Sequence, residues 1–422
     1  FRVRNGIGYC PFAIITRQWL FTYKTNRCKA NFMTMIKDNL LYFLILTVII
    51  TLFYCFKVWE VYPIYGGEFL SDWNYIATYY ECTFSVTCEN TYPFIYPKIW
   101  FNFYNFFKND FNLVIYPFII FYLFSSIYFF QNSKKIIHFF LLFSPHSILA
   151  IQRGNNEIII YFFLFVFLIF LNNRNEILSL ITLSIASILK LYPLILAVIY
   201  LLENKNNKWI RILLFLSVFI LGIFLLNDIL YIQKYIVPNV LLTYSSSVLL
   251  KLLSFFIKFS YFDLIFYLIS FFFIIFIYIK LLRFELKFPT NYQHENSFLI
   301  GSLILSASFF LSTSFDYRLI FVVFTFPYIS EFLELNFKKK IIKTFIIFIL
   351  IFFWMEFIIF YYYDFIDFTK NKSSFGYIVN FQNIILGSLM ILKNIFYWIL
   401  NIGLIFISIN IILKKQDFLR FK

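Results

Sequence analysis

The sequence predicts an all-α polytopic membrane protein, a bundle of about 11 or 12 transmembrane helices with one long polar loop near its start. The chain is 62% hydrophobic and 25% aromatic, with a mean hydropathy of +0.80, far above soluble averages. Its apolar segments are too many and too long for one globular core to bury. The basic residues, which give a net charge of +15, lie in short loops, as the positive-inside rule requires.

Residues 1–32 differ from the rest of the chain because they lack sustained hydrophobicity. We expect them to be a non-native or disordered extension, since they are too polar for a cleaved signal peptide. Residues 33–422 then form one integral membrane domain, in which residues 57–112 are the long outer loop. The basic charge does not indicate nucleic-acid binding, because no soluble basic domain is present to carry it.

The spans follow from the apolar runs, because roughly 20 apolar residues cross a bilayer and short or bent spans need fewer. We expect spans at residues 39–56, 113–130, 136–151, 158–171, 177–202, 210–226, 264–282, 298–311, 319–335, 341–362 and 395–413. Clusters of Lys and Arg mark the cytoplasmic turns and place both termini inside. The loop 57–112 carries more acidic than basic residues, which suits the outer side.

The run 177–202 has cytoplasmic charge signals at both ends but is short for two full spans. Pro193 breaks the helical bonding ladder and disfavours helical geometry at Tyr192. We therefore expect two short helices with residues 190–193 at their outer apex, which gives about 12 helices. One tilted helix is the alternative, and it gives about 11.

Polar clusters recur at the predicted outer ends of the spans. Besides Asp72 in the loop, they are residues 152–157, 190–193 and 314–318. Charged groups at membrane depth are unfavourable unless they are paired or line a wet cavity, so these clusters are candidate functional residues.

Together the clusters contain the groups that one sugar-transfer site needs: a base, cations for a phosphate, and side chains that line a cavity. A carboxylate at a water-facing mouth can act as general base on a sugar hydroxyl, the role predicted for Asp72. Lys190, Arg153 and Arg318 can neutralise a phosphate on which negative charge grows. Aromatic faces and polar groups from the same clusters are predicted to line the cavity: Trp73, Tyr75, Tyr96, Asn155, Glu157, Asp316 and Tyr317.

Each candidate also has a purely structural alternative. Asp72 can cap an interfacial helix, and Lys190 can extend to the interface without touching a ligand. Arg153 can pair with Glu157 across one helical turn, and Asp316 can pair with Arg318. The sequence leaves these alternatives open.

Cysteine and histidine give no metal pattern. Cys82 and Cys88 lie in the outer loop and can form a local disulfide if the loop faces an oxidising compartment, which the sequence leaves open. His146 is expected to form a hydrogen bond near the outer face, and His294 is expected in a cytoplasmic loop. No Asp-x-Asp pair argues for a divalent ion, so a metal requirement stays open and no cofactor is expected.

Five motifs run in a characteristic order across about residues 35–335. They are Ser71-Asp72-Trp73-Asn74-Tyr75, Tyr92-Pro93-Phe94-Ile95-Tyr96-Pro97, Arg153-Gly154-Asn155-Asn156-Glu157, Leu189-Lys190-Leu191-Tyr192-Pro193 and Phe315-Asp316-Tyr317-Arg318-Leu319. This order resembles the GT-C membrane glycosyltransferases, and most closely glycosyltransferase family 87, whose members use polyprenol-phosphate-mannose. Departures are Lys98 after Tyr96-Pro97, and Glu157 where relatives often have Asp.

The resemblance implies a GT-C-like bundle with short interfacial helices in the outer loop. It implies inverting transfer of a mannose-like hexose from a polyprenyl-phosphate sugar to a glycan or glycolipid acceptor, at the extracytoplasmic face of the cytoplasmic membrane. Asp72 would be the base, and Lys190 with Tyr192 would lie near the lipid phosphate. The alternative is a transporter or flippase of lipid-linked saccharides. The concentration of charge at one face favours the transferase.

Overall fold

The computed structural model describes residues 74–78, 80, 97, 99–108, 110–133, 144–202, 208–227, 230, 243–254, 286–311, 314–338 and 384–420, with isolated residues between 265 and 279 and between 340 and 359. The chain divides into two compact units, residues 1–62 and 63–422. All described residues belong to the second unit. The predicted extension 1–32 and the predicted span 39–56 therefore lie outside them.

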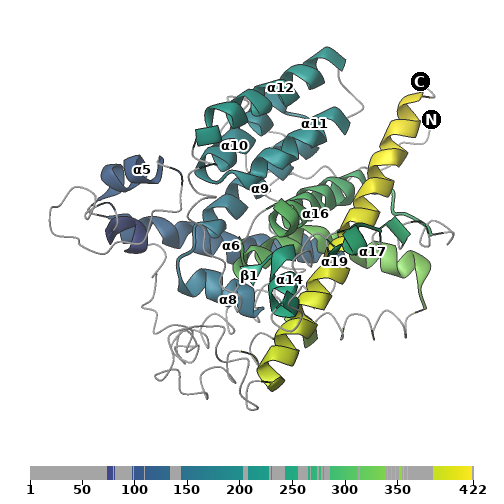
Figure 1. Cartoon of the computed structure of the whole chain (residues 1–422). Coiled ribbons are helices and arrows are strands. Elements are labelled where there is room, and N and C mark those ends of the chain that lie inside the picture. The colour runs from purple at the N-terminus through teal and green to yellow at the C-terminus, as the bar shows by residue number, and fades with distance from the viewer. Residues whose placement is uncertain are drawn as a thin grey trace. The chain divides into compact units, whose positions relative to one another are not determined.

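The described part of the second unit is built almost entirely of helices (Figure 1). Its only β-structure there is a two-residue ladder in which Thr243 pairs with Phe315 and Tyr244 with Ser314. The elements in chain order are α5 (Ile99–Phe107), α6 (Phe111–Ser133), α8 (Pro145–Gln152), α9 (Glu157–Asn172), α10 (Glu176–Leu189), η2 (Tyr192–Ala197), α11 (Val198–Leu202), α12 (Lys208–Phe224), β1 (Thr243–Tyr244), α14 (Ser246–Ser254), α16 (Tyr292–Leu311), β2 (Ser314–Phe315), η3 (Asp316–Phe321), α17 (Val322–Asn336) and α19 (Ile384–Arg420).

The run 177–202 forms a helical hairpin, which confirms the prediction of two short helices. α10 ends at Leu189, Lys190 is extended, and the 3-10 helix η2 begins at Tyr192 with Pro193 in its first turn. The hydroxyls of Ser179, near the start of α10, and Tyr200, in α11, lie 3.0 Å apart. The chain therefore returns along α10 after the break, so a single tilted helix is excluded.

The helix α16 lies at the centre of the packing, in contact with α17, α19, η2 and α9. Phe298, Leu299 and Ile300 on α16 are fully buried. A second buried layer joins α6, α8 and α9, where the Tyr122 and Tyr161 rings pack edge-to-face at 4.7 Å. The hydroxyls of these two tyrosines lie 2.8 Å from those of Ser147 and Ser125, so these four buried hydroxyls have partners.

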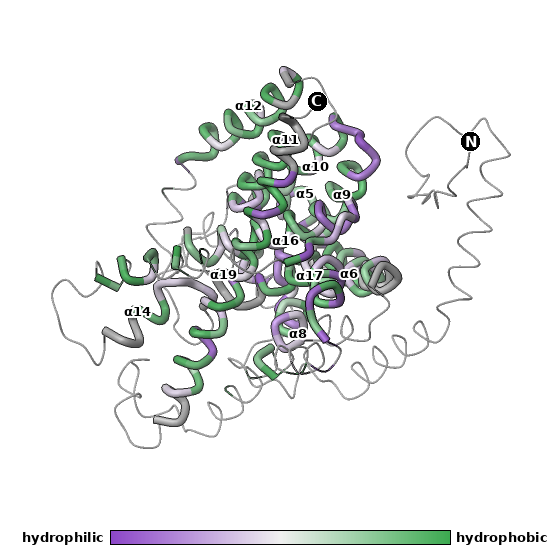
Figure 2. Tube along the Cα trace, turned by 90° about the vertical axis from the view of Figure 1, so that its right-hand side faces the viewer, coloured by the Kyte–Doolittle hydropathy of each residue, from purple (hydrophilic) through white to green (hydrophobic). Residues whose placement is uncertain are grey.

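Two described helical stretches are long and apolar enough to cross a membrane, Arg318–Asn336 and Gly387–Lys414. A third candidate is the pair α8 and α9, which is bent by 112° at its break. The helix α12 exposes apolar side chains along its length, including Leu213, Phe219 and Phe224, and Figure 2 shows it as mainly hydrophobic. Such a face suits lipid better than water. The helical class is confirmed, while the count of 11 or 12 spans stays a prediction.

Helix boundaries differ from the predicted spans at polar ends. α16 begins at Tyr292, six residues before the predicted start at residue 298. His294 therefore lies in the first turn of a helix, and its predicted place in a loop was wrong. The apolar run at 298–311 marks only the buried part of the helix, because hydropathy does not register a polar first turn.

The packing of α16 against η3 and α17 depends on Gly301. A Cβ atom added at Gly301 would lie 2.8 Å from the Phe324 Cβ atom and 2.9 Å from the Phe321 carbonyl oxygen. Real Cβ atoms do not approach so closely, so only glycine lets the two backbones come together here.

We expect Gly301→Ala to destabilise the protein by about 1–3 kcal/mol through overpacking, seen as a lower apparent Tm of the detergent-solubilised chain. The matched control is Gly403→Ala on α19, where an added Cβ meets no atom within 4 Å. That variant should be neutral or more stable by roughly 0.5–1 kcal/mol, because alanine favours the helix. Equal effects of the two substitutions would contradict the close-approach role.

Candidate anion site

The site is built around the break between α8 and α9. Two backbone carbonyl groups at the end of α8 accept hydrogen bonds from the residues that follow. The Gly154 N–H donates to the Ile151 oxygen at 3.1 Å, and the Asn155 N–H donates to the Ala150 oxygen at 2.9 Å. Gly154 has a φ of 56°, the left-handed conformation that this type of helix end requires. The Asn155 side chain then accepts the Glu157 N–H at 2.9 Å, which starts α9.

Glu157, the first residue of α9, is fully buried and meets side chains from two distant segments. Its Oε1 atom lies 2.7 Å from Lys190 Nζ and accepts a hydrogen bond from Arg318 Nε at 3.0 Å. Its Oε2 atom accepts a hydrogen bond from the Tyr192 hydroxyl. Both carboxylate oxygens are thus engaged, and two cations compensate the buried charge.

Local backbone geometry delivers these partners. Pro193 prevents α10 from continuing, so Lys190 and Tyr192 lie at the turn between α10 and η2. Arg318 lies in η3, directly after the β2 strand that pairs with β1. Its guanidinium also lies over the Tyr192 ring, 4.7 Å from the centroid. Such a cation–π contact favours one position of both side chains.

The site holds more hydrogen-bond donors than the carboxylate can accept. Arg318 Nη1 and Asn156 Nδ2 are buried and have no hydrogen-bond partner among the described residues. The Asn156 Oδ1 atom accepts a hydrogen bond from Lys190 Nζ at 2.9 Å, which leaves its amide nitrogen as the unused donor. Buried donors that have no partner among the described residues, next to the cationic groups of Lys190 and Arg318, suit an anionic ligand.

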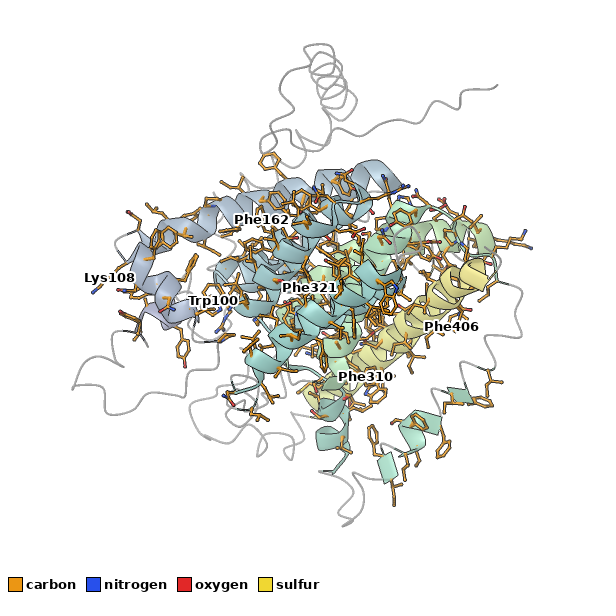
Figure 3. The ribbon with its side chains drawn as sticks, turned by 90° about the horizontal axis from the view of Figure 1, so that it is seen from above. Trp100, Lys108, Phe162, Phe310, Phe321 and Phe406 are labelled. Atoms are coloured by element: carbon orange, nitrogen blue, oxygen red, sulfur yellow. The ribbon has the colours of Figure 1, made fainter. Side chains whose placement is uncertain are left out.

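The outer loop is anchored next to this site. The Trp100 indole nitrogen on α5 donates to the carbonyl oxygen of Leu189 at 2.9 Å, one residue before Lys190. Trp100 is completely buried. The ring centroids of Tyr80 and Tyr104, two other residues of the outer loop, lie 4.9 Å apart. Figure 3 shows Trp100 at the edge of the helical body and Phe321, which packs against Tyr192, nearer its middle.

The structure brings five predicted residues together: Asn155, Glu157, Lys190, Tyr192 and Arg318. Arg153, at the C-cap of α8, is half-buried in the same loop. Tyr75 lies in the helical segment 74–78. Asp316 and Tyr317 belong to η3, but their side chains are outside the described ones. Asp72, Trp73, Tyr96, Cys82 and Cys88 also lie outside the described residues, so their roles stay predictions.

A second buried polar network was missed by the sequence reasoning, except for one member. His146 Nε2 lies 3.2 Å from the Tyr397 hydroxyl, which confirms the predicted hydrogen bond of His146. Lys393 is 1% exposed, with its ammonium 5.6 Å from the centroid of the Tyr397 ring. The hydroxyl of Tyr244 hydrogen-bonds with the Asn401 amide. A lone lysine within the apolar run of α19 was the available signal.

Ion pairs also lie at the opposite ends of these helices. His294 Nδ1 is 2.9 Å from a Glu331 carboxylate oxygen, and Lys414 Nζ is 3.1 Å from Glu295 Oε1. Both pairs lie at the first turn of α16, through His294 and Glu295. This helix has 20 residues, so its last residue, Leu311, lies about 30 Å away from them. Ion pairs therefore lie at both ends of this helix, and the prediction that functional charges gather at one membrane face stays a prediction.

Comparison with protein-family models finds no match, and no curated protein is significantly similar to the chain. The helices define the class: this is a helical membrane protein, with two described stretches apolar enough to span a bilayer. Within the described ranges, no group of three His, Cys, Asp or Glu side chains could hold a metal ion.

We expect Glu157→Ala to destabilise the protein by about 3–5 kcal/mol, because it leaves two buried cations without their counter-ion. A lower apparent Tm in detergent would measure this. Glu331→Ala is the matched control, since the Glu331 side chain is 36% exposed and pairs of exposed charges contribute at most about 1 kcal/mol. A Glu157 variant no less stable than the Glu331 variant would contradict the role of the buried ion group.

Proposed function

We propose that this protein is an inverting hexosyltransferase that moves a mannose-like sugar from a polyprenyl-phosphate donor to a glycan or glycolipid acceptor. The reaction would occur at the extracytoplasmic face of the cytoplasmic membrane. The observation that carries the proposal is the pair of buried donors, Arg318 Nη1 and Asn156 Nδ2, that have no partner among the described residues and lie next to the anchored outer loop. The resemblance to GT-C enzymes supplies the reaction class.

The anion site suits the phosphate of such a donor. Within the described part of the chain, Arg318 offers a guanidinium nitrogen and Asn156 an amide nitrogen that donate to no partner, and Lys190 offers a point charge. Guanidinium and ammonium groups are the usual protein ligands of phosphate. Because negative charge grows on the phosphate as it departs, these donors stabilise the transition state more than the bound donor.

The proposed step is a single displacement. The acceptor hydroxyl oxygen forms a bond to the anomeric carbon, and the bond from that carbon to the phosphate oxygen breaks. The electron pair of the broken bond stays on the phosphate, and the hydroxyl proton passes to the carboxylate of Asp72. Attack opposite the leaving group inverts the anomeric configuration. Trp100 supports this assignment by tying the end of the outer loop to the turn that carries Lys190.

The second candidate is a transporter or flippase of lipid-linked saccharides. The ion pairs at both ends of the helix layer favour it, because alternating access needs polar groups on both sides of the membrane. Movement of a labelled lipid-linked sugar across vesicle membranes without any acceptor would support the transporter. Formation of a new glycosidic bond by the purified protein would support the transferase.

Lys190→Ala should lower kcat by about 10²–10³-fold in reconstituted vesicles supplied with a defined polyprenyl-phosphate hexose, because one donor to the leaving phosphate is lost. Lys338→Ala is the control, since Lys338 is exposed beyond the end of α17. An unchanged kcat in the Lys190 variant, with the control equally active, would contradict the phosphate-binding role.

Asp72→Asn should reduce transfer by about 10²–10⁴-fold, because asparagine cannot accept the acceptor's proton. The matched control is Asp110→Asn, which removes an exposed carboxylate near the other end of the same loop. Donor binding should survive in both variants, measured by competition with a labelled donor analogue. Full transferase activity in the Asp72 variant would show that another group is the base.

A further inference from the structure

The end of α10 leaves a backbone carbonyl group that its own helix cannot satisfy. Leu189 is the last residue of α10, and it is buried. The last carbonyl groups of an α-helix have no donor within the helix. In a longer helix the Leu189 oxygen would accept the N–H of residue 193, but Pro193 has no N–H. A buried carbonyl group without a donor is unfavourable, so this position needs a donor from elsewhere in the fold.

The donor comes from α5, 89 residues earlier in the chain. Trp100 is the second residue of that helix, and its indole N–H donates to the Leu189 oxygen at 2.9 Å. The ring itself is held in place, because it is completely buried and packs edge-to-face with Phe103 at 5.5 Å. The Trp100 backbone N–H donates to the Pro97 oxygen at 3.1 Å. Both the backbone and the ring of Trp100 are therefore fixed.

This hydrogen bond fixes the peptide group that leads into Lys190. A peptide group is planar, so the Leu189 C=O and the Lys190 N–H turn together. The C=O accepts from Trp100, and the N–H donates to the Ala186 oxygen at 3.0 Å. Both polar groups of this one plane are thus bonded. The residue that follows directly is Lys190, whose ammonium lies 2.7 Å from Glu157.

We infer that Trp100 is a positioning residue for the proposed transfer and that it acts through Lys190. Its ring is buried and its N–H already has an acceptor, so it holds the turn and does not touch the sugar. A displacement of about 1 Å in a group that acts on the reaction can lower the rate roughly 10²-fold. The inference rests on the proposed function, because it takes Lys190 as a ligand of the leaving phosphate.

The test removes the indole donor and keeps the shape of the ring. Stop-codon suppression introduces β-(3-benzothienyl)alanine, in which sulfur replaces the indole N–H, at position 100 of the full-length chain. Transfer is measured in reconstituted vesicles with a defined polyprenyl-phosphate hexose and an acceptor. We expect kcat to fall by about ten- to hundredfold. The KM for the donor should change little, because the lost interaction acts mainly in the transition state.

The matched control is the same replacement at Trp398 on α19. This tryptophan is also buried, but its indole nitrogen has no hydrogen-bond partner among the described residues. Removing its N–H therefore breaks no described hydrogen bond, and kcat should stay at the wild-type value. A loss at position 100 with none at position 398 assigns the effect to the bond with Leu189.

A second comparison separates positioning from stability. In a Lys190→Ala protein Trp100 has no ammonium group left to position, so replacing Trp100 as well should lower kcat little further. Two changes that act independently would instead multiply their effects. A merely structural Trp100 would lower the apparent Tm and would reduce kcat by the same factor in both backgrounds.

A loss of kcat that disappears in the Lys190→Ala background supports the inference. If the effects multiply, or if kcat is unchanged, the inference is wrong and the proposed function still stands. If the wild-type protein transfers no sugar, the proposed function fails and the inference fails with it. Should the replaced protein not fold, Trp100→Phe in the same two backgrounds decides by the same criterion. Failure of both replacements to fold would show a structural role and overturn the inference.

Discussion

The buried carboxylate of Glu157 is the constraint on which the arrangement of this helical body depends. An ionised carboxylate without solvent is strongly unfavourable unless cations and hydrogen-bond donors surround it. Here the donors come from the α10–η2 turn and from η3, which lie far away along the chain. The break between α8 and α9, the end of α10 and the chain before α17 must therefore meet at one point.

Short-range rules predicted the local geometry of this meeting point. Pro193 predicted the break of the run 177–202, and the polar clusters at 152–157, 190–193 and 314–318 marked the ends of helices. The ion-pair partners of Glu157 could not be predicted from such short-range rules. Arg153 was an equally reasonable partner for Glu157 within one turn, whereas the structure pairs Glu157 with Lys190 and with Arg318, which is 161 residues away. Only tertiary packing decides between them.

Polar residues inside apolar runs were harder to recognise. Lys393 is buried in α19 beside Tyr397, yet the predicted span 395–413 begins two residues after it, and α19 itself begins at Ile384. The start of α16 was misplaced for the same reason, because His294 and its polar neighbours hide the first helical turn. Hydropathy identifies helix interiors well and helix ends poorly, and functional groups concentrate at the ends.

The two ends of the helix layer are chemically different, although both carry ion pairs. Around His294 and Lys414 the partners are partly exposed, with Glu331 36% and Lys414 44% accessible, so solvent weakens their interaction. Around Glu157 the charges are buried, and donors of Arg318 and Asn156 remain unused. Unused donors in a dry place are unfavourable for folding alone. Asn172 Nδ2, at the other end of α9, also lacks a partner among the described residues. The unused donor of Arg318, however, is cationic and lies beside a buried ion group, which is the strongest reason to place ligand binding there.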